Sequence, residues 1–267
     1  MSPAQPGTAE THAEPPVALV PQTAAPWRRR VAAHALAEAR TVLRNGEQLV
    51  ITLVLPVLLL VGLARTTVID LGTSDRIGLV APGVLALAVM STAFTSQAIA
   101  TGFDRRNGVL RLLATTPLGR GGLVAGKVAA VLLLEALQMT VLVGIALGLG
   151  WRPHPAGLPA ALGALVLGTA AFTSLALLIA GTLRAEAVLA VANLLWVLLL
   201  AGGGVVLPVE MLPGPLAGLV TLLPSGALGE ALRTALTDGT FSWGAASVLL
   251  AWTVVLGAGT VRLFRWS

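Results

Sequence analysis

Six apolar segments, each long enough to cross a lipid bilayer, constrain this chain more than any other feature. A helix needs roughly 20 apolar residues to cross the hydrocarbon core. Of the 267 residues, 56% are hydrophobic and 11% are charged, whereas globular domains carry about 25% charged residues. We therefore expect an all-α membrane protein with six transmembrane helices, at about residues 48–64, 78–102, 124–149, 157–182, 187–207 and 243–263.

The residues before the first span divide into two parts. Residues 1–26 are rich in Pro, Ala, Thr and Glu and are expected to form a disordered tail. Residues 27–45 place arginines on one side of a helical wheel and apolar side chains on the other. This pattern favours an amphipathic helix on the inner leaflet, and the alternative is a simple helical extension of the first span.

The basic residues indicate the orientation. Lys and Arg are enriched in cytoplasmic loops of membrane proteins. With six spans and both termini inside, most of the 17 basic residues fall in cytoplasmic segments. We therefore expect a multi-pass protein of a bacterial cytoplasmic membrane with both ends in the cytoplasm.

The loop between the second and third spans is basic and contains a short helical pattern. A helix over Asp104–Ala114 places Asp104, Asn107 and Arg111 on one side. Four apolar residues fall on the other side, and Pro117 ends the pattern. This favours a helix parallel to the membrane, with its apolar side toward the bilayer and its charged side toward a cytoplasmic partner. The alternative is a solvated basic loop without a partner.

Polar residues inside the apolar segments form a second candidate site. Glu135 and Gln138 lie on one face of the third span, because they are three residues apart. Ionisable residues in a span are expensive and usually functional or paired. They are expected either to line a translocation path together with Asn193, or to join helices by hydrogen bonds to Asn193 or Gln97.

The segment 208–240 is apolar but contains four prolines. Proline interrupts a helix, so this segment cannot form one continuous span. Irregular backbone is tolerated at membrane depth only where protein or a wet cavity covers it. We expect two short helices that re-enter the outer side of the bundle, and the alternative is an extracellular loop.

Two motifs resemble a known family. The sequence DRRNGVLRLLATTPLGRGGLVAGK, starting at Asp104, is similar to the cytoplasmic loop of ABC-2 type transporter permeases, although Arg106 stands where many members have a second acidic residue. The sequence GGGVVLPVEMLPGPLAGLVTLLPSGALGEALRTAL resembles the segment after their fifth span. The matching residues are Asp104, Arg105, Gly108, Leu110, Arg111, Ala114, Thr115, Pro117, Leu118, Gly126 and Lys127 in the first motif, and Gly202, Gly203, Pro208, Leu212, Pro213, Leu223, Pro224, Glu230, Ala231, Leu232 and Arg233 in the second.

The resemblance implies that residues 27–267 form the transmembrane domain of an ATP-driven exporter, similar to the drug-efflux branch of high-GC Gram-positive bacteria. An ABC ATPase subunit would dock on the cytoplasmic face and bind ATP and Mg, and a second copy or a homologous permease would complete a dimer. A lipophilic drug, a lipid-linked molecule and another amphiphile all fit as cargo. The implied ATPase-coupling residues are Asp104, Arg105, Arg106, Asn107, Gly108, Arg111 and Pro117, and the implied outer gate contains Pro208, Glu210, Pro213, Pro224, Glu230 and Arg233.

Other chemistry has less support in the sequence. Gly121–Lys127 has the spacing of a phosphate-binding loop, but Val128 follows where Ser or Thr must ligate Mg²⁺. We therefore expect no ATPase site, catalytic residue, cofactor or metal in this chain, and no nucleic-acid partner, because the charges lie in short loops and aromatic residues are few. The alternative function is a membrane-embedded enzyme or assembly factor that acts on a lipid or haem-like substrate.

Overall fold

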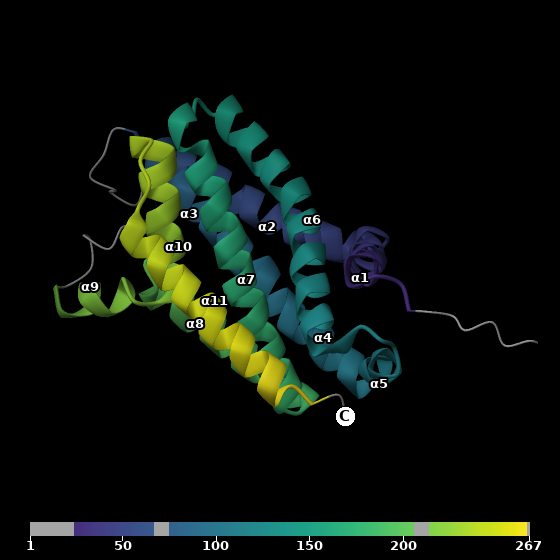
Figure 1. Cartoon of the computed structure of the whole chain (residues 1–267). Coiled ribbons are helices and arrows are strands. Elements are labelled where there is room, and N and C mark those ends of the chain that lie inside the picture. Colours follow the sequence, from purple (N-terminus) through teal and green to yellow (C-terminus); the bar gives the residue numbers. More distant parts are fainter. Residues whose placement is uncertain (1–23, 67–74, 206–213, 266–267) are drawn as a thin grey trace, which may run out of the picture.

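The structure, a computed structural model, describes residues 24–66, 75–205 and 214–265. These residues are helical and include no strand, so the expectation of an all-α protein is confirmed for the described part. The helices are α1 (Trp27–Leu43), α2 (Gly46–Arg65), α3 (Arg76–Met90), α4 (Gln97–Arg106), α5 (Val109–Ala114), α6 (Gly119–Gly148), α7 (Leu158–Thr182), α8 (Ala185–Gly202), α9 (Gly214–Val220), α10 (Pro224–Arg233) and α11 (Trp243–Leu263), with π-helical segments at Ser91–Ser96 and Thr234–Asp238 and a 3₁₀ turn at Pro155–Gly157 (Figure 1).

Five helices in the described part are long and apolar enough to cross a membrane. The first predicted span corresponds to a shorter apolar helix, Thr52–Arg65, so the count of six spans stays a prediction. The five longer helices are Arg76–Arg106, Gly119–Gly148, Pro155–Thr182, Ala185–Gly202 and Trp243–Leu263.

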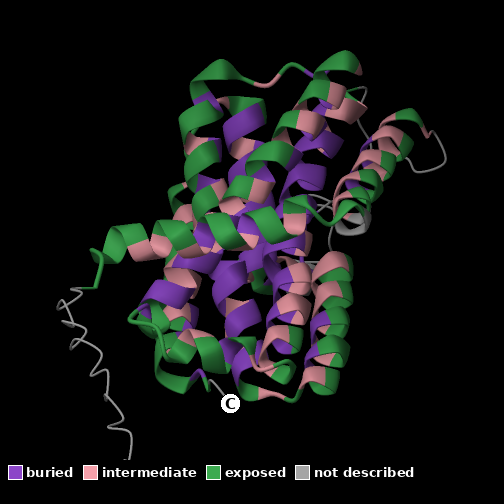
Figure 2. Ribbon diagram, turned by 90° about the vertical axis from the view of Figure 1, so that its right-hand side faces the viewer, coloured by how far each residue is buried: buried purple, intermediate pink, exposed green. Residues whose placement is uncertain are grey.

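The long helix formed by α3, the π-helical segment and α4 is the centre of the bundle. In its most apolar stretch, 83% of the residues are buried, and Figure 2 shows that buried residues gather in the middle of the bundle. Helices α2, α6, α7, α8 and α10 pack around parts of this long helix. Its residues are mostly small or branched, such as Ala86, Ala88 and Val89, which have no exposed surface. Small side chains allow helices to approach closely, and packing rather than hydrophobicity drives association in lipid.

Helix α1 lies across the bundle instead of along it. Figure 1 shows α1 nearly end-on beside α6, and Figure 2 shows it running across the other helices. Its buried residues, Ala35 and Ala39, are on the side that packs on α6, while Trp27, Leu36 and Leu43 are exposed. A transverse helix with exposed apolar and basic side chains has the form expected of an interfacial helix, and its place in the membrane stays a prediction.

The structure corrects the expected helix over Asp104–Ala114. Asp104 belongs to the last turn of α4, which ends at Arg106. Gly108 then adopts φ +79°, a left-handed conformation that glycine adopts without strain. This residue separates α4 from α5, so Asp104 and Arg111 do not share one helical face.

The apolar segment before the last span contains α9 and α10, as the two-helix expectation required. Almost every residue of α10 is buried, against α3, α7 and α11, whereas Leu219 in α9 is 64% exposed. Their depth in the membrane stays a prediction. Pro208, Glu210 and Pro213 lie outside the described residues.

The orientation can be tested by cysteine labelling, because the chain has no native cysteine. Exposed Arg152 follows α6 and exposed Thr240 follows α10, and both positions are expected outside the cell. Exposed Thr116 precedes α6 and exposed Arg184 follows α7, and both positions are expected in the cytoplasm. We expect Arg152→Cys and Thr240→Cys to react with a membrane-impermeant maleimide in intact cells. Thr116→Cys and Arg184→Cys should react only after lysis, and labelling of Thr116→Cys in intact cells would contradict the orientation.

Candidate functional site

The only lysine of the chain is buried where α1, α4 and α6 meet. Lys127 has 0% of its side chain exposed, and its Nζ contacts Glu38 Oε1 of α1. The same Nζ lies 3.4 Å from Asp104 Oδ2 of α4, and His34 Nε2 lies 3.3 Å from Glu38 Oε2. We call His34, Glu38, Asp104 and Lys127 the inner ion cluster. It joins the transverse helix α1 to the end of α4, just before α5.

The inner ion cluster has an excess of acidic groups. Two carboxylates, Glu38 and Asp104, face the single ammonium of Lys127. Burial lowers the pKa of His34, and Lys127 adds to this effect while Glu38 and Asp104 oppose it. The lowered pKa favours the neutral form of His34 near pH 7.

The predicted ATPase-coupling residues divide between inward and outward positions. Arg105 Nη1 donates hydrogen bonds to the carbonyl oxygens of Ala180 and Leu183, at 3.2 and 3.0 Å. These carbonyls lie at the C-terminal end of α7, where a helix leaves acceptors free. Asp104 also points inward, to Lys127. These two residues therefore act within the protein in this structure.

The outward positions surround α5. Arg106, Asn107, Arg111 and Pro117 are exposed, and Arg106 Nη1 lies 3.8 Å from Glu186 Oε1 at the start of α8. Both of those side chains are largely exposed, so the ion pair adds little stability.

Protein does not cover every apolar side chain of α5, and the orientation of α5 toward the bilayer stays a prediction. Leu110 is fully buried, but Val109 is 42% and Leu112 is 70% exposed. Because α5 is only six residues long, its apolar side chains cannot all face the rest of the protein.

Gln138 joins three helices through hydrogen bonds. Its Nε2 donates to the carbonyl oxygen of Thr52 in α2 at 2.8 Å, and its Oε1 accepts from Thr92 Oγ1 at 3.1 Å. In an α-helix the carbonyl of residue 52 would accept from the N–H of residue 56, but Pro56 has no N–H. Gln138 thus supplies the donor that Pro56 removes. This supports a helix-joining role, although the partners are threonine residues and not the expected Asn193 or Gln97.

Glu135 faces a different helix. It is 3% exposed, and its Oε2 accepts a hydrogen bond from Thr169 Oγ1 of α7. Its Oε1 has no hydrogen-bond partner among the described residues. Asn193 is exposed on α8, so the structure does not bring the predicted three polar residues together.

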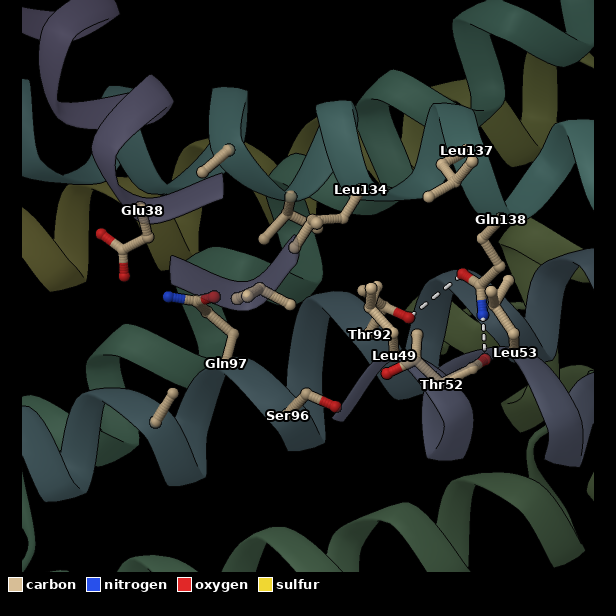
Figure 3. Close-up of a pocket in the computed structure, with 14 residues that line it drawn as sticks. Glu38, Leu49, Thr52, Leu53, Thr92, Ser96, Gln97, Leu134, Leu137 and Gln138 are labelled. Atoms are coloured by element: carbon tan, nitrogen blue, oxygen red, sulfur yellow. Dashed lines mark hydrogen bonds between the residues drawn. The ribbon is translucent and has the colours of Figure 1, made fainter. Parts of the chain in front are cut away.

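A pocket lies between α1, α2, α4 and α6, near the inner ion cluster. It has about 40 Å³ of water-accessible volume, which is enough for a few water molecules. Leucines of α2 and α6 form much of its wall. Figure 3 shows Glu38 and Gln97 at one end and the hydrogen bonds of Gln138 at the other. The polar residues that line the pocket are Glu38, Thr52, Thr92, Ser96, Gln97 and Gln138.

Arg233 holds the backbone that follows α8. Its guanidinium donates to the carbonyl oxygens of Gly204 at 2.9 Å and Val205 at 3.3 Å. Its Nε lies 4.0 Å from Glu230 Oε2. Pro224, the first residue of α10, is buried. Of the predicted gate residues, these three therefore lie on one buried helix that is joined to the end of α8.

The chain matches the profile of a known family over residues 72–262, and the description of that family is "ABC-2 family transporter protein". This range covers well over half of the chain. The chain belongs to the ABC-2 transporter family. No curated protein matches it closely enough to add a narrower assignment. The members of this family are membrane subunits of transporters, so this ABC-2 protein is a multi-pass membrane protein that takes part in transport.

Sequence reasoning missed several partners in this ABC-2 transporter. Glu38, Thr92 and Thr169 each meet a predicted polar residue from another helix. One signal for Glu38 was available, because it is an acidic residue in a helix otherwise rich in arginine. No comparable signal marks the threonines. Among the described residues, no three His, Asp or Glu side chains come close enough to hold a metal ion.

Removing Lys127 should destabilise the transporter. Lys127→Met leaves Glu38 and Asp104 without their buried cation, and we expect a loss of roughly 3 kcal/mol in the free energy of unfolding. The triple variant Glu38→Gln, Asp104→Asn, Lys127→Met removes every charge of the trio and should recover most of that loss. Thermal unfolding of the purified protein in detergent measures both, and a triple variant as unstable as Lys127→Met would contradict the charge argument.

The role of Gln138 can be tested against Pro56. Gln138→Leu leaves the Thr52 carbonyl without a donor, and we expect it to lower stability by about 2 kcal/mol. In a Pro56→Ala background the helix supplies its own N–H, so Gln138→Leu should lower stability much less. Thr140→Leu is the matched control, because exposed Thr140 bonds only within α6. An equal loss in both backgrounds would show that Gln138 does not compensate for Pro56.

Proposed function

We propose that this protein is the transmembrane subunit of an ATP-driven exporter, and that an ABC ATPase docks on α5. The observation that carries the proposal is the exposed surface of α5 in a member of the ABC-2 transporter family. ATP and Mg would be bound by the ATPase, and export would move an amphiphilic or lipophilic substrate out of the cytoplasmic membrane.

The surface of α5 has the composition of a small docking site. Leu112 is 70% and Val109 is 42% exposed, at the same end of the bundle as the end of α11 (Figure 1). The exposed basic residues Arg106 and Arg111 lie beside them. An apolar anchor with a polar rim is typical of protein–protein interfaces. A partner groove with an apolar floor and acidic edges would complement this surface.

The connections of α5 would carry movement of the ATPase into the membrane. On one side α5 follows α4, whose last turn binds Lys127 through Asp104 and α7 through Arg105. On the other side the chain enters α6 through Gly119, which adopts φ +70°. A displacement of α5 would therefore act on α1, α6 and α7 together, through buried polar contacts rather than through flexible linkers.

The outer end supplies a candidate gate. Arg233 attaches α10 to the end of α8, and Gly229 approaches the backbone so closely that an added Cβ would lie 2.9 Å from the Gly204 carbonyl oxygen. We propose that this junction opens when cargo leaves, and that a second copy or a homologous permease completes the path.

The ATPase-docking proposal predicts a strong effect of Leu112→Asp. A charge at the apolar anchor should weaken binding of the co-expressed ATPase subunit by roughly 2 kcal/mol or more, about 30-fold in affinity. The variant should still insert and purify, because Leu112 is largely exposed. Co-purification and ATP-dependent export from inverted vesicles measure the effect.

Two controls make this experiment specific. Leu112→Met keeps the anchor apolar and should bind normally. Leu263→Asp introduces the same charge at a residue that is 58% exposed near the end of α11, and it should leave ATPase binding intact. Normal binding and export by Leu112→Asp would show that α5 is not the coupling element.

A further inference from the structure

A larger cavity lies between α7, α10 and the start of α11. These three helices pack on one another, and Figure 1 shows α11 running along α7. The cavity has a volume of about 480 Å³, which is within the usual range for small-molecule sites. We call it the lateral groove. It is lined by residues between 160 and 167 of α7, by Ala231 of α10, and by Phe241, Ser242 and Ala246 at the start of α11.

Small residues create the lateral groove. Ala160, Gly163 and Ala164 line it from α7, and Ala231 and Ala246 line it from the other two helices. A Cβ added to Gly163 would have no atom of a neighbouring helix within 4 Å. Small residues in membrane helices usually allow close packing, but here they leave a space that no side chain among the described residues fills.

The lining of the lateral groove fits an apolar ligand. Nine of the ten residues that line it are apolar or glycine, and none is charged. The exception, Ser242, caps α11, because its Oγ accepts a hydrogen bond from the backbone N–H of Ala245 at 3.4 Å. Leu162 and Val166, which also line the groove, are 62% and 48% exposed. The occupant must therefore be apolar along most of its length.

The position and size of the lateral groove favour a single hydrocarbon chain. Both α7 and α11 belong to helices that are long and apolar enough to cross a membrane, so the groove opens to lipid. From Ala160 to Leu167 the rise along α7 is roughly 10 Å, compared with about 15 Å of hydrocarbon in one leaflet. A helix segment of that length, about 10 Å wide, occupies roughly 800 Å³. The groove is therefore too small for a helix of a second copy.

The mouth of the lateral groove carries two aromatic residues. Phe241 lines the groove and is 44% exposed, and Trp243 is 79% exposed. Their ring centroids are 4.6 Å apart in an edge-to-face arrangement. Tryptophan is enriched where membrane helices meet the interface with water. Because Trp243 is the first residue of α11, the groove runs from the interface into the hydrocarbon, as a lipid tail does.

We propose that the lateral groove binds one acyl chain of a membrane lipid. The ester end of the chain would lie beside Ser242 and Trp243, and its methyl end would point toward Leu167. The bound chain would contact Ala231 of α10, two residues before Arg233, which joins α10 to the backbone after α8. The site recognises the chain rather than a headgroup, and its binding depends neither on an ATPase nor on export.

The test uses the full chain in lipid nanodiscs without any ATPase. The probe is a phosphatidylcholine with a photoactivatable diazirine in the middle of one acyl chain, and adducts are mapped by mass spectrometry. Residues 160–167 of α7 are compared with the exposed surface of α6 around Gly144, which lies at a similar distance from the same end of the bundle. We expect at least about threefold more adduct in the groove, because a groove buries more of a ligand than a helix surface does.

Two variants locate the site. Gly163→Phe places a large side chain in the empty space of the groove, and Ala246→Leu narrows the groove from α11. Each should lower adduct formation in the groove to the level of the α6 surface. The matched control is Gly144→Phe, because an added Cβ there also has open space around it, and it should leave labelling of the groove unchanged. Thermal unfolding confirms that each variant is folded.

The remaining outcomes would overturn the proposal. Equal labelling of the groove and the α6 surface would do so, as would undiminished labelling of the groove in folded Gly163→Phe or Ala246→Leu. A phosphatidylglycerol probe with the same chain should label the groove equally, and dependence on the headgroup would contradict recognition of the chain. Gly163→Cys should remain monomeric on oxidation, since the chain has no native cysteine, and a disulfide-linked dimer would assign the groove to a second copy. A failure of ATPase docking or export would leave all these results unchanged.

Discussion

A buried backbone carbonyl needs a hydrogen-bond donor, and this constraint explains much of the polar structure of the bundle. Gln138 donates to the carbonyl that Pro56 leaves free. Arg105 donates to carbonyls at the end of α7, and Arg233 does the same for the backbone after α8. In each case a side chain from one helix satisfies a break or an end in another. These residues therefore determine which helices are neighbours, which apolar packing alone specifies weakly.

The inner ion cluster follows a different rule, because it compensates charge rather than backbone. A fully buried ammonium is tolerable only with an opposite charge in contact. Lys127 obtains one carboxylate from α1 and one from α4. The arrangement makes the position of the transverse helix depend on the end of α4. A buried pair of this kind adds more to the choice of one arrangement than to net stability.

Length and apolarity in the sequence indicated where several of the long apolar helices lie. The predicted last span, 243–263, coincides with α11 (Trp243–Leu263). The error over Asp104–Ala114 arose because helical spacing was followed across Gly108, where the backbone turns left-handed. Polar partners were harder to predict. Glu135 and Gln138 share a face by spacing, yet they bond to different helices, and Asn193 faces outward. Such pairings depend on the rotation of each helix, which no single-helix pattern contains.

The π-helical segment connects these observations to the pocket. A π-helical turn inserts a residue into a helix and is frequent at functional sites. Here the segment Ser91–Ser96 lies in the middle of the central helix, and it carries Thr92 and Ser96 into the pocket lining, directly before Gln97. The same helix continues to Asp104 and Arg105 and then to α5. On the proposed function, the central helix therefore carries part of the pocket lining and the contact to the inner ion cluster, and Gly108 connects it to the ATPase-docking helix α5. A movement of α5 would shift Asp104 relative to Lys127 and Glu38, and Glu38 lines the acidic end of the pocket.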